Sequence, residues 1–153
     1  MQWVTYAQVG LDRAACVWLI RRHLDPQAEI AYLDEQTLAA AVAAGALPFH
    51  LTTQEEGADP ERTSFSLLLA EYKLDQADPA LVLLGQILAD AELQPSGGHA
   101  EATGIRAVAA GMAALAHDDG DQVARLLPIW EALYTECRRG LAGQGDWANG
   151  EES

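Results

Sequence analysis

The sequence predicts an α+β fold, with a small β-sheet near the N-terminus and a predominantly helical remainder. Segments rich in β-branched and aromatic residues occur within the first 52 positions. From position 64 onward, apolar residues recur at helical spacing. The chain has 153 residues, half of them hydrophobic, which suits one core. We therefore expect a single domain over residues 1–140 and a disordered tail over residues 141–153.

The first strand and the first helix are predicted from local signals. WVTYA, residues 3–7, combines β-branched and aromatic residues and predicts a short strand. Asp12 is expected to be the N-cap of a helix that continues to about Leu24. The Asp25-Pro26 pair should end this helix, because the residue before a proline disfavours the helical conformation.

A second strand and a second helix follow in the same order. AEIAYL, residues 28–33, predicts a strand, and Asp34 is expected to open an alanine-rich helix. That helix should close at Gly45, since glycine is favoured just after a helix ends. LPFHLT, residues 47–52, is a weaker third strand candidate.

The chain is expected to be helical after a polar loop over residues 53–62. Residues 64–74, SFSLLLAEYKL, predict one helix. Asp78 and Pro79 then provide an N-cap and a proline at the first helical position, the placement that proline prefers. The helix that they open should reach about Leu93.

Two further helices are predicted near the C-terminus. Residues 104–116, GIRAVAAGMAALA, place their larger apolar side chains on one stripe. Asp119 and Gln122 have the spacing of a capping box, which predicts a last helix to about Gly140.

Composition excludes several classes of partner. The formal charge of −14 disfavours nucleic acid and anionic membrane surfaces, both of which carry phosphates. We find no signal peptide or membrane-spanning run, so a cytoplasmic location is expected. Cys16 and Cys137 do not have the spacing of a disulfide framework. Gly104 and Gly111 could allow close helix approach in a homodimer.

The segment DRAACVWLIRRHLDP, residues 12–26, stands out because it gathers three of the nine basic residues around a cysteine and a tryptophan. Guanidinium groups suit bidentate recognition of oxyanions, and a thiol is oxidisable. A small anion or a metal ligand is therefore the expected partner. The candidate ligand-binding residues are Asp12, Arg13, Cys16, Trp18, Arg21 and Arg22.

The same residues also have purely structural explanations. Arg21 and Arg22 fall in the last turns of the helix, where cations interact favourably with the helix dipole, and Asp25 is near enough to pair with them. Cys16 could be a small buried hydrophobe. Cys16 and His23 are seven residues apart, roughly 10 Å along a helix, too far to share one tetrahedral metal ion.

VGLDRAACVWLIRRHLDPQAEIAYL, residues 9–33, resembles the opening motif of the chromate-resistance protein family, the domain found at the C-terminal end of ChrB. That motif runs approximately V-D-R-x-A-C-P-W-L-I-R-R-F-I-D-P-x-A-E-F, and Val17 here replaces its proline. The matching residues are Asp12, Arg13, Ala15, Cys16, Trp18, Leu19, Ile20, Arg21, Arg22, Asp25, Pro26, Ala28 and Glu29.

Later segments extend the resemblance to about residues 3–140. GALPFHL (45–51) is similar to G-A-I-P-F-D, TSFSLLLAEYKLDQADPAL (63–81) to C-S-F-D-x-x-L-x-K-Y-x-L-x-D-P-A-L, and PIWEALYTECRR (128–139) to P-x-Y-D-A-L-Y-x-W-C-R. The resemblance implies a role in chromate resistance. The resemblance also implies that longer relatives carry an extra N-terminal region that contacts DNA, and this chain is expected to begin at the shared domain. We therefore expect a stand-alone sensing or accessory domain.

The family's metal-site positions have changed here. Where the resemblance implies E-x-G-H-x-G, this chain has Ala58 in place of the histidine, and Ala89 stands where a later helix would carry another. Glu55, Asp59 and Glu92 could still hold a hard divalent cation through oxygen atoms, but they lack the imidazole that favours zinc or iron. We expect this metal site to be lost; the alternative is a small metal-assisted enzyme with an altered ligand set.

Overall fold

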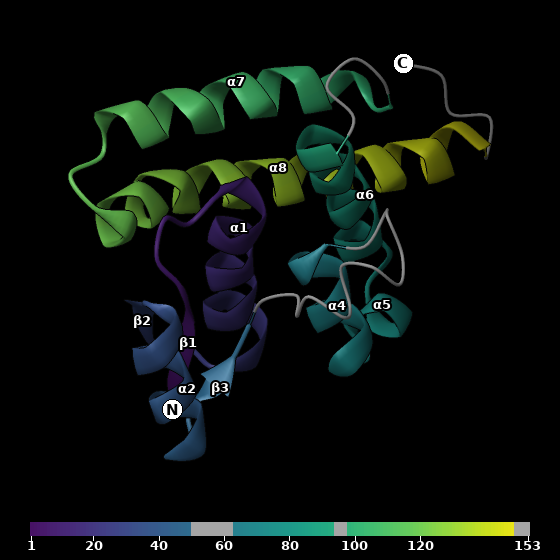
Figure 1. The fold of residues 1–153 in the computed structure, drawn as a ribbon. Coiled ribbons are helices and arrows are strands. Elements are labelled where there is room, and N and C mark those ends of the chain that lie inside the picture. The colour runs from purple at the N-terminus through teal and green to yellow at the C-terminus, as the bar shows by residue number, and fades with distance from the viewer. Residues whose placement is uncertain (50–62, 94–97, 149–153) are drawn as a thin grey trace.

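The computed structural model describes residues 1–49, 63–93 and 98–148, with side chains as far as residue 143. A small parallel sheet lies at one end of the molecule, and helices form the remainder (Figure 1). The predicted α+β class is confirmed.

The sheet has three described strands in the order β2-β1-β3, all parallel. They are β1 (Gln2–Tyr6), β2 (Glu29–Leu33) and β3 (Leu47–Pro48). The first two agree with the predicted strands. The third is shorter than the predicted 47–52, and residues 50–52 lie outside the described part. Because parallel neighbours need crossover connections, a helical segment follows each of the first two strands.

The first helical segment contains an unpredicted change of winding. Helix α1 (Leu11–Leu19) continues directly into a π-helical turn, η1 (Ile20–Leu24). The expected N-cap was wrong: Gly10 is the N-cap, and Asp12 lies in the first turn of α1. The reason is that the carboxylate of Asp12 has partners in another helix.

Asp12 caps helix α4 (Ser64–Glu71) from outside. Its two carboxylate oxygens accept hydrogen bonds from the backbone N–H groups of Ser64 and Phe65, at 2.8 and 3.0 Å. Thr63 and Ser66 form a capping box at the same helix end. Together these contacts satisfy N–H groups of the first turn that have no partner inside the helix.

Helix α2 (Glu35–Ala43) begins and ends as predicted. The Asp34 side chain accepts from the Thr37 N–H at 2.8 Å. After the helix, Gly45 has φ +108°, a conformation that favours glycine. This helix lies beside the sheet, where its Leu38 packs with the fully buried Val4 of β1.

The predicted helix over residues 64–74 is interrupted. Helix α4 ends at Glu71, and α5 (Leu74–Ala77) begins after Lys73, whose φ of +57° breaks the helical path. Helix α6 (Pro79–Leu93) follows, and the Asp78 carboxylate accepts from the Ala80 N–H at 2.9 Å. The expected Asp78-Pro79 start is confirmed.

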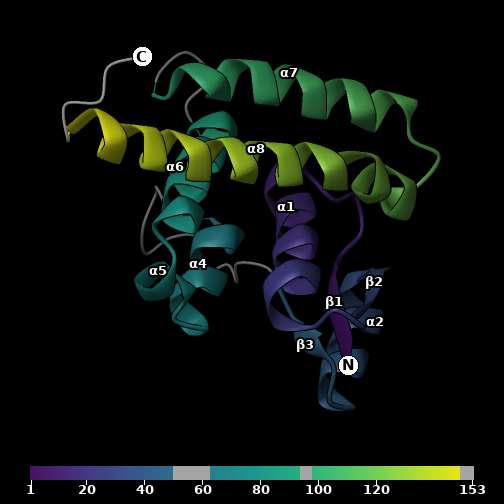
Figure 2. The ribbon, with the colours of Figure 1, turned by 180° about the vertical axis from the view of Figure 1, so that it is seen from behind.

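Helices α7 (Ala100–Leu115) and α8 (Asp119–Ala148) lie side by side across the top of the molecule, as both views show (Figures 1 and 2). Helix α8 runs to Ala148, beyond the predicted end near Gly140. Residues 149–153 of the expected tail lie outside the described part.

The expected capping box of Asp119 and Gln122 was displaced by one residue. The Asp118 carboxylate accepts from the Asp121 N–H at 2.8 Å, and Asp121 accepts from the His117 N–H at 2.9 Å. Asp119 is instead used for tertiary contact. It accepts from the backbone N–H groups that precede α1, those of Gln8 and Val9, at 3.0 and 2.8 Å.

The core is centred on α1, which packs against α4, α6 and α8. Seven of its nine residues are buried, so the helix is covered on all sides. Trp130, Phe65 and Leu126 are fully buried around it. None of the described helices has both the length and the apolar character to cross a membrane.

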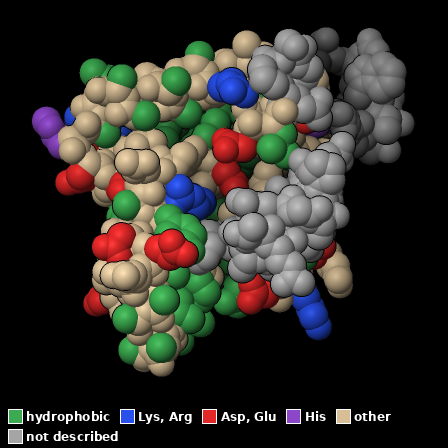
Figure 3. Space-filling view, in the orientation of Figure 1, with side chains coloured by type: hydrophobic (Ala, Val, Ile, Leu, Met, Phe, Trp, Pro, Cys, Tyr) green, Lys and Arg blue, Asp and Glu red, His purple; other side chains and the backbone are tan. Residues whose placement is uncertain are grey.

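One face of α7 is exposed and carries few charges. An added Cβ at Gly104 or Gly111 would contact nothing, and Val108 and Leu115 are exposed. The ridge along α7 is mostly hydrophobic or uncharged in Figure 3. The homodimer expected from these glycines stays a prediction.

Replacing Asp12 should destabilise the protein. We expect Asp12→Ala to lower the free energy of unfolding by about 2 kcal/mol, because two helix-terminal N–H groups lose their acceptor. Urea unfolding followed by circular dichroism measures this. Asp34→Ala is the matched control: it removes one exposed cap and should cost about 1 kcal/mol. A loss at Asp12 no larger than at Asp34 would contradict the proposed importance of this contact.

The same carboxyl predicts a pH effect. Burial raises the pKa of Asp12 above its ordinary 3.8, despite the two backbone hydrogen bonds. The native state therefore holds this proton more tightly than the unfolded chain. Stability of the wild type relative to Asp12→Asn should fall as the pH rises from below 3.8 through the folded pKa. Parallel stability curves for the two proteins over this range would contradict the direction of the shift.

Candidate functional site

Arg13 forms hydrogen bonds to β1 and to the loop between β1 and α1. Its guanidinium donates to the backbone carbonyls of Tyr6 and Gln8, the second at 2.9 Å, and to the Thr5 hydroxyl at 3.3 Å. Gln8 has a left-handed φ of +63°, which turns the chain between β1 and α1. Arg13 therefore braces this turn, and its N–H groups are directed at the protein's own oxygen atoms.

Cys16 lies too deep to contact a ligand at the surface. The Cys16 side chain has no exposed surface, and burial raises the pKa of its thiol well above the ordinary value of 9.0. The nearby Asp12 carboxylate acts in the same direction. Cys137 is also buried, and both cysteines are free. The structure thus separates the thiol from the exposed arginines of the same segment.

Arg21 and Arg22 lie in the π-helical turn. The Asp25 N–H donates to the Ile20 carbonyl at 2.6 Å, the five-residue spacing of a π-turn. Such turns are frequent at functional sites because they change the direction of side chains within a helix. Both arginines are exposed. Arg21 has no hydrogen bond or ion pair with any residue that the structure describes.

Glu131 of α8 connects the tryptophan and the arginine of the motif. A single carboxylate oxygen, Oε1, accepts from Nε1 of Trp18 at 2.9 Å and from Nε of Arg22 at 3.3 Å. Glu131 and Arg22 are each 44% exposed. Two donors from α1 and η1 thus converge on one oxygen atom at the edge of the core.

Tyr134 lies beneath this contact. Its ring packs against the rings of Trp18 and His23, with centroids 5.3 and 5.5 Å away. The guanidiniums of Arg22 and Arg138 lie 5.8 and 5.7 Å from the Tyr134 centroid. Burial and a 2.5 Å hydrogen bond to Asp78 raise the pKa of Tyr134 to about 12, so the phenol stays protonated. The aromatic rings therefore form a fixed base for the cations.

A shallow pocket of about 360 Å³ opens at this place. It lies between η1 and the middle of α8, where the proline of the closing motif, Pro128, faces the arginines. Two guanidiniums and one carboxylate line it, so its local charge is positive in a protein with 23 acidic residues. Its lining residues are Trp18, Arg21, Arg22, Leu127, Pro128 and Glu131.

The described residues do not form a metal site. No group of three or more histidine, cysteine or acidic side chains is placed to hold an ion within residues 1–49, 63–93 and 98–143. Glu92 has an exposed surface at the end of α6, and partial desolvation by the surrounding protein, followed by the nearby Asp12 carboxylate, raises its pKa. Glu55 and Asp59, with Ala58, lie outside the described part. The predicted set of Glu55, Asp59 and Glu92 therefore stays a prediction.

The site residues on α8 were not predicted from the sequence. Glu131, Tyr134 and Arg138 approach the motif only through the packing of α1 on α8. The one sequence feature that could have identified them is the resemblance of residues 128–139 to the closing motif of the family. The opening and closing motifs of the resemblance thus meet in one place.

Thiol labelling tests the burial of the cysteines. The thiolate is the reactive form, and burial raises the pKa of Cys16 well above 9.0 and that of Cys137 to about 11. Iodoacetamide at neutral pH should therefore leave both unmodified in the folded protein and label both in denaturant, as measured by mass spectrometry. Rapid labelling of Cys16 in the native state would contradict this and would restore the thiol as a ligand candidate.

Comparison with known proteins agrees with the motif resemblance. Residues 3–137 match the family model described as ChrB, C-terminal domain. The chain is 38% identical over 139 residues to Protein ChrB of Cupriavidus metallidurans (strain ATCC 43123 / DSM 2839 / NBRC 102507 / CH34). That match covers 88% of this chain and 40% of the relative, so the chain spans less than half the length of the relative.

No solved structure matches the chain. The family match nevertheless covers nearly all of β1, the whole of α1, and α8 as far as residue 137. The chain belongs to the ChrB C-terminal domain family.

Proposed function

We propose that this chromate-resistance domain is a sensing or accessory protein that binds a small tetrahedral dianion, with chromate as the first ligand to test. The pocket between η1 and α8 is the binding site. The observation that carries the proposal is the pair of hydrogen bonds to Oε1 of Glu131. The N–H groups of Trp18 and Arg22 both donate to this carboxylate oxygen, and the same two donors could bind an oxygen of an oxyanion.

The donors are arranged as oxyanion recognition requires. The indole N–H of Trp18 and the Nε–H of Arg22 point to one oxygen position from two sides. Charge-assisted hydrogen bonds from guanidinium are among the strongest in proteins, and Arg21 adds a second guanidinium without a partner of its own in the described chain. A dianion in the pocket would take these donors and release Glu131 toward solvent.

Electrostatics limit where a dianion can bind to this protein. The net charge of −14 repels anions over most of the surface, so retention requires a local excess of cations. Arg21 and Arg22 provide it at the pocket, and Arg138 adds a third guanidinium beside Tyr134. Cation–π contact with the Tyr134 ring helps to hold Arg22 and Arg138 in place.

The redox and metal alternatives have less support. A thiol that is fully buried does not meet a dissolved oxidant, so oxidation of Cys16 is not part of the proposal. The metal-assisted enzyme depends on Glu55 and Asp59, and no observation on the described residues favours it.

The proposal is tested by titrating the protein with chromate, sulfate and phosphate at low ionic strength in a calorimeter. Glu131→Gln should tighten binding about fivefold, because it removes a competing negative charge worth about 1 kcal/mol and keeps an oxygen acceptor for Trp18. Arg21→Gln with Arg22→Gln should weaken binding at least tenfold. Added salt should weaken the wild-type interaction.

Arg139→Gln is the control for loss of charge, because it removes one positive charge from α8, the helix of Glu131, outside the pocket. Its affinity should equal that of the wild type. Failure of all three anions to bind would overturn the proposal. Weaker binding by Glu131→Gln, with an unchanged circular dichroism spectrum, would show that the carboxylate assists the ligand and does not compete with it.

A further inference from the structure

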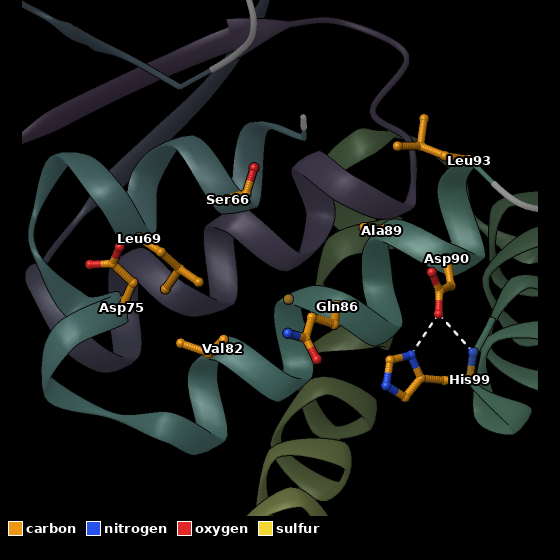
Figure 4. A pocket seen from close by; sticks show the side chains of 10 residues that line it. Ser66, Leu69, Asp75, Val82, Gln86, Ala89, Asp90, Leu93 and His99 are labelled. Atoms are coloured by element: carbon orange, nitrogen blue, oxygen red, sulfur yellow. Dashed lines mark hydrogen bonds and ion pairs between the residues drawn. The ribbon is translucent and has the colours of Figure 1, made fainter. Parts of the chain in front are cut away.

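A second pocket, of about 380 Å³, lies apart from the arginine site between α4, α5 and α6, with His99 at its edge. It lies at the low end of the size range of small-molecule sites. Figure 4 shows Asp75 at one end and the pair of Asp90 and His99 at the other, with Gln86 between them. The apolar part of the wall is formed by Leu69, Val82, Gly85, Ala89 and Leu93.

The His99 end of the pocket is rigidly built. One oxygen of the Asp90 carboxylate accepts from the backbone N–H of His99 at 2.7 Å and lies 2.6 Å from Nδ1 of its ring. Gly98 approaches so closely that an added Cβ would lie 2.2 Å from the same oxygen, and its φ is +82°. These contacts hold the imidazole at the pocket edge. In the neutral ring with the proton on Nδ1, Nε2 is left as an acceptor.

The middle of the pocket exists because two helical positions are small. Gly85 lets α6 approach α4, since an added Cβ would already lie 3.3 Å from the Phe65 ring. Ala89 lines the pocket one turn later on α6. A larger side chain at Ala89 would extend into the space that a ligand would use.

The charge of the lining defines the class of ligand. Asp75 and Asp90 contribute two carboxylates, and no lysine or arginine is among the lining residues that the structure describes. The pocket is therefore negative in either protonation state of His99. Asp75 is exposed and has no hydrogen bond or ion pair with another described residue. An anion would be repelled, and a cation with an apolar body would contact both the carboxylate and the hydrophobic wall.

We propose that this pocket binds a small organic amine, whose ammonium group pairs with Asp75 while its apolar body covers Leu69 and Val82. Gln86 and Nε2 of His99 accept a hydrogen bond from a second donor where the amine carries one. This site is separate from the oxyanion pocket and depends neither on the arginines of η1 nor on the proposed function. The domain thus has two binding sites of opposite charge.

The experiment compares three probes of nearly equal size that differ in charge: 2-phenylethylamine, 2-phenylethanol and phenylacetate. Binding at pH 8 is followed by nitrogen–proton correlation spectra of the labelled full chain. The amine should bind about tenfold more tightly than the alcohol, phenylacetate should not bind, and shifts should centre on Asp75, Val82 and Gln86. Equal affinity for the amine and the alcohol, or no binding of the amine, would overturn the proposal.

Two variants and a control locate the site. Asp75→Asn should abolish the preference for the amine over the alcohol, whereas Glu35→Gln, which removes an exposed carboxylate from α2, should keep it. Ala89→Leu, at a partly exposed position, should fill the pocket and remove binding of both. Retained amine preference in Asp75→Asn, or retained binding in a folded Ala89→Leu protein, would place the amine elsewhere and overturn the proposal.

Discussion

The Asp12 carboxylate joins the first turn of α1 to the first turn of α4, segments that lie 52 residues apart. The Asp119 carboxylate makes a similar connection to α8, because it accepts hydrogen bonds from the backbone just before α1 and joins it to the start of α8. The two contacts thus set the position of α1 between α4 and α8. The position of Trp18, Arg21 and Arg22 against α8 follows from this arrangement.

The signature segment therefore divides into two parts with different physical roles. Its first part is structural: Asp12 caps another helix, Arg13 braces a turn, and Cys16 fills the core. Its second part reaches the surface, because the π-helical turn carries Arg21 and Arg22 out of the packed region. A single sequence motif thus combines the support of the site with the groups that face a ligand.

Elements whose signals are local were predictable from the sequence. The Asp34 cap, the Asp78-Pro79 start and the glycine after α2 each act within a few residues, and each was found where expected. Asp12 and Asp119 were assigned to the wrong partners because their spacing also suits a local cap, while their carboxylates bind distant backbone. The π-turn had no sequence signal, since its wider winding depends on the packing around it. Glu131 was not identified because its partners are 113 and 109 residues away.

The internal contact of Glu131 bears on which anions the proposed site would select. A ligand must displace a carboxylate that carries one negative charge and is tethered beside its donors. A monovalent anion gains little by this exchange, because it replaces one single charge with another and loses its own freedom of movement. A dianion gains from the second charge, which Arg21, at the wall of the same pocket, is placed to attract. Competition with the protein's own carboxylate would thus favour tetrahedral dianions over the more abundant monovalent ions, without a contact specific to any one of them.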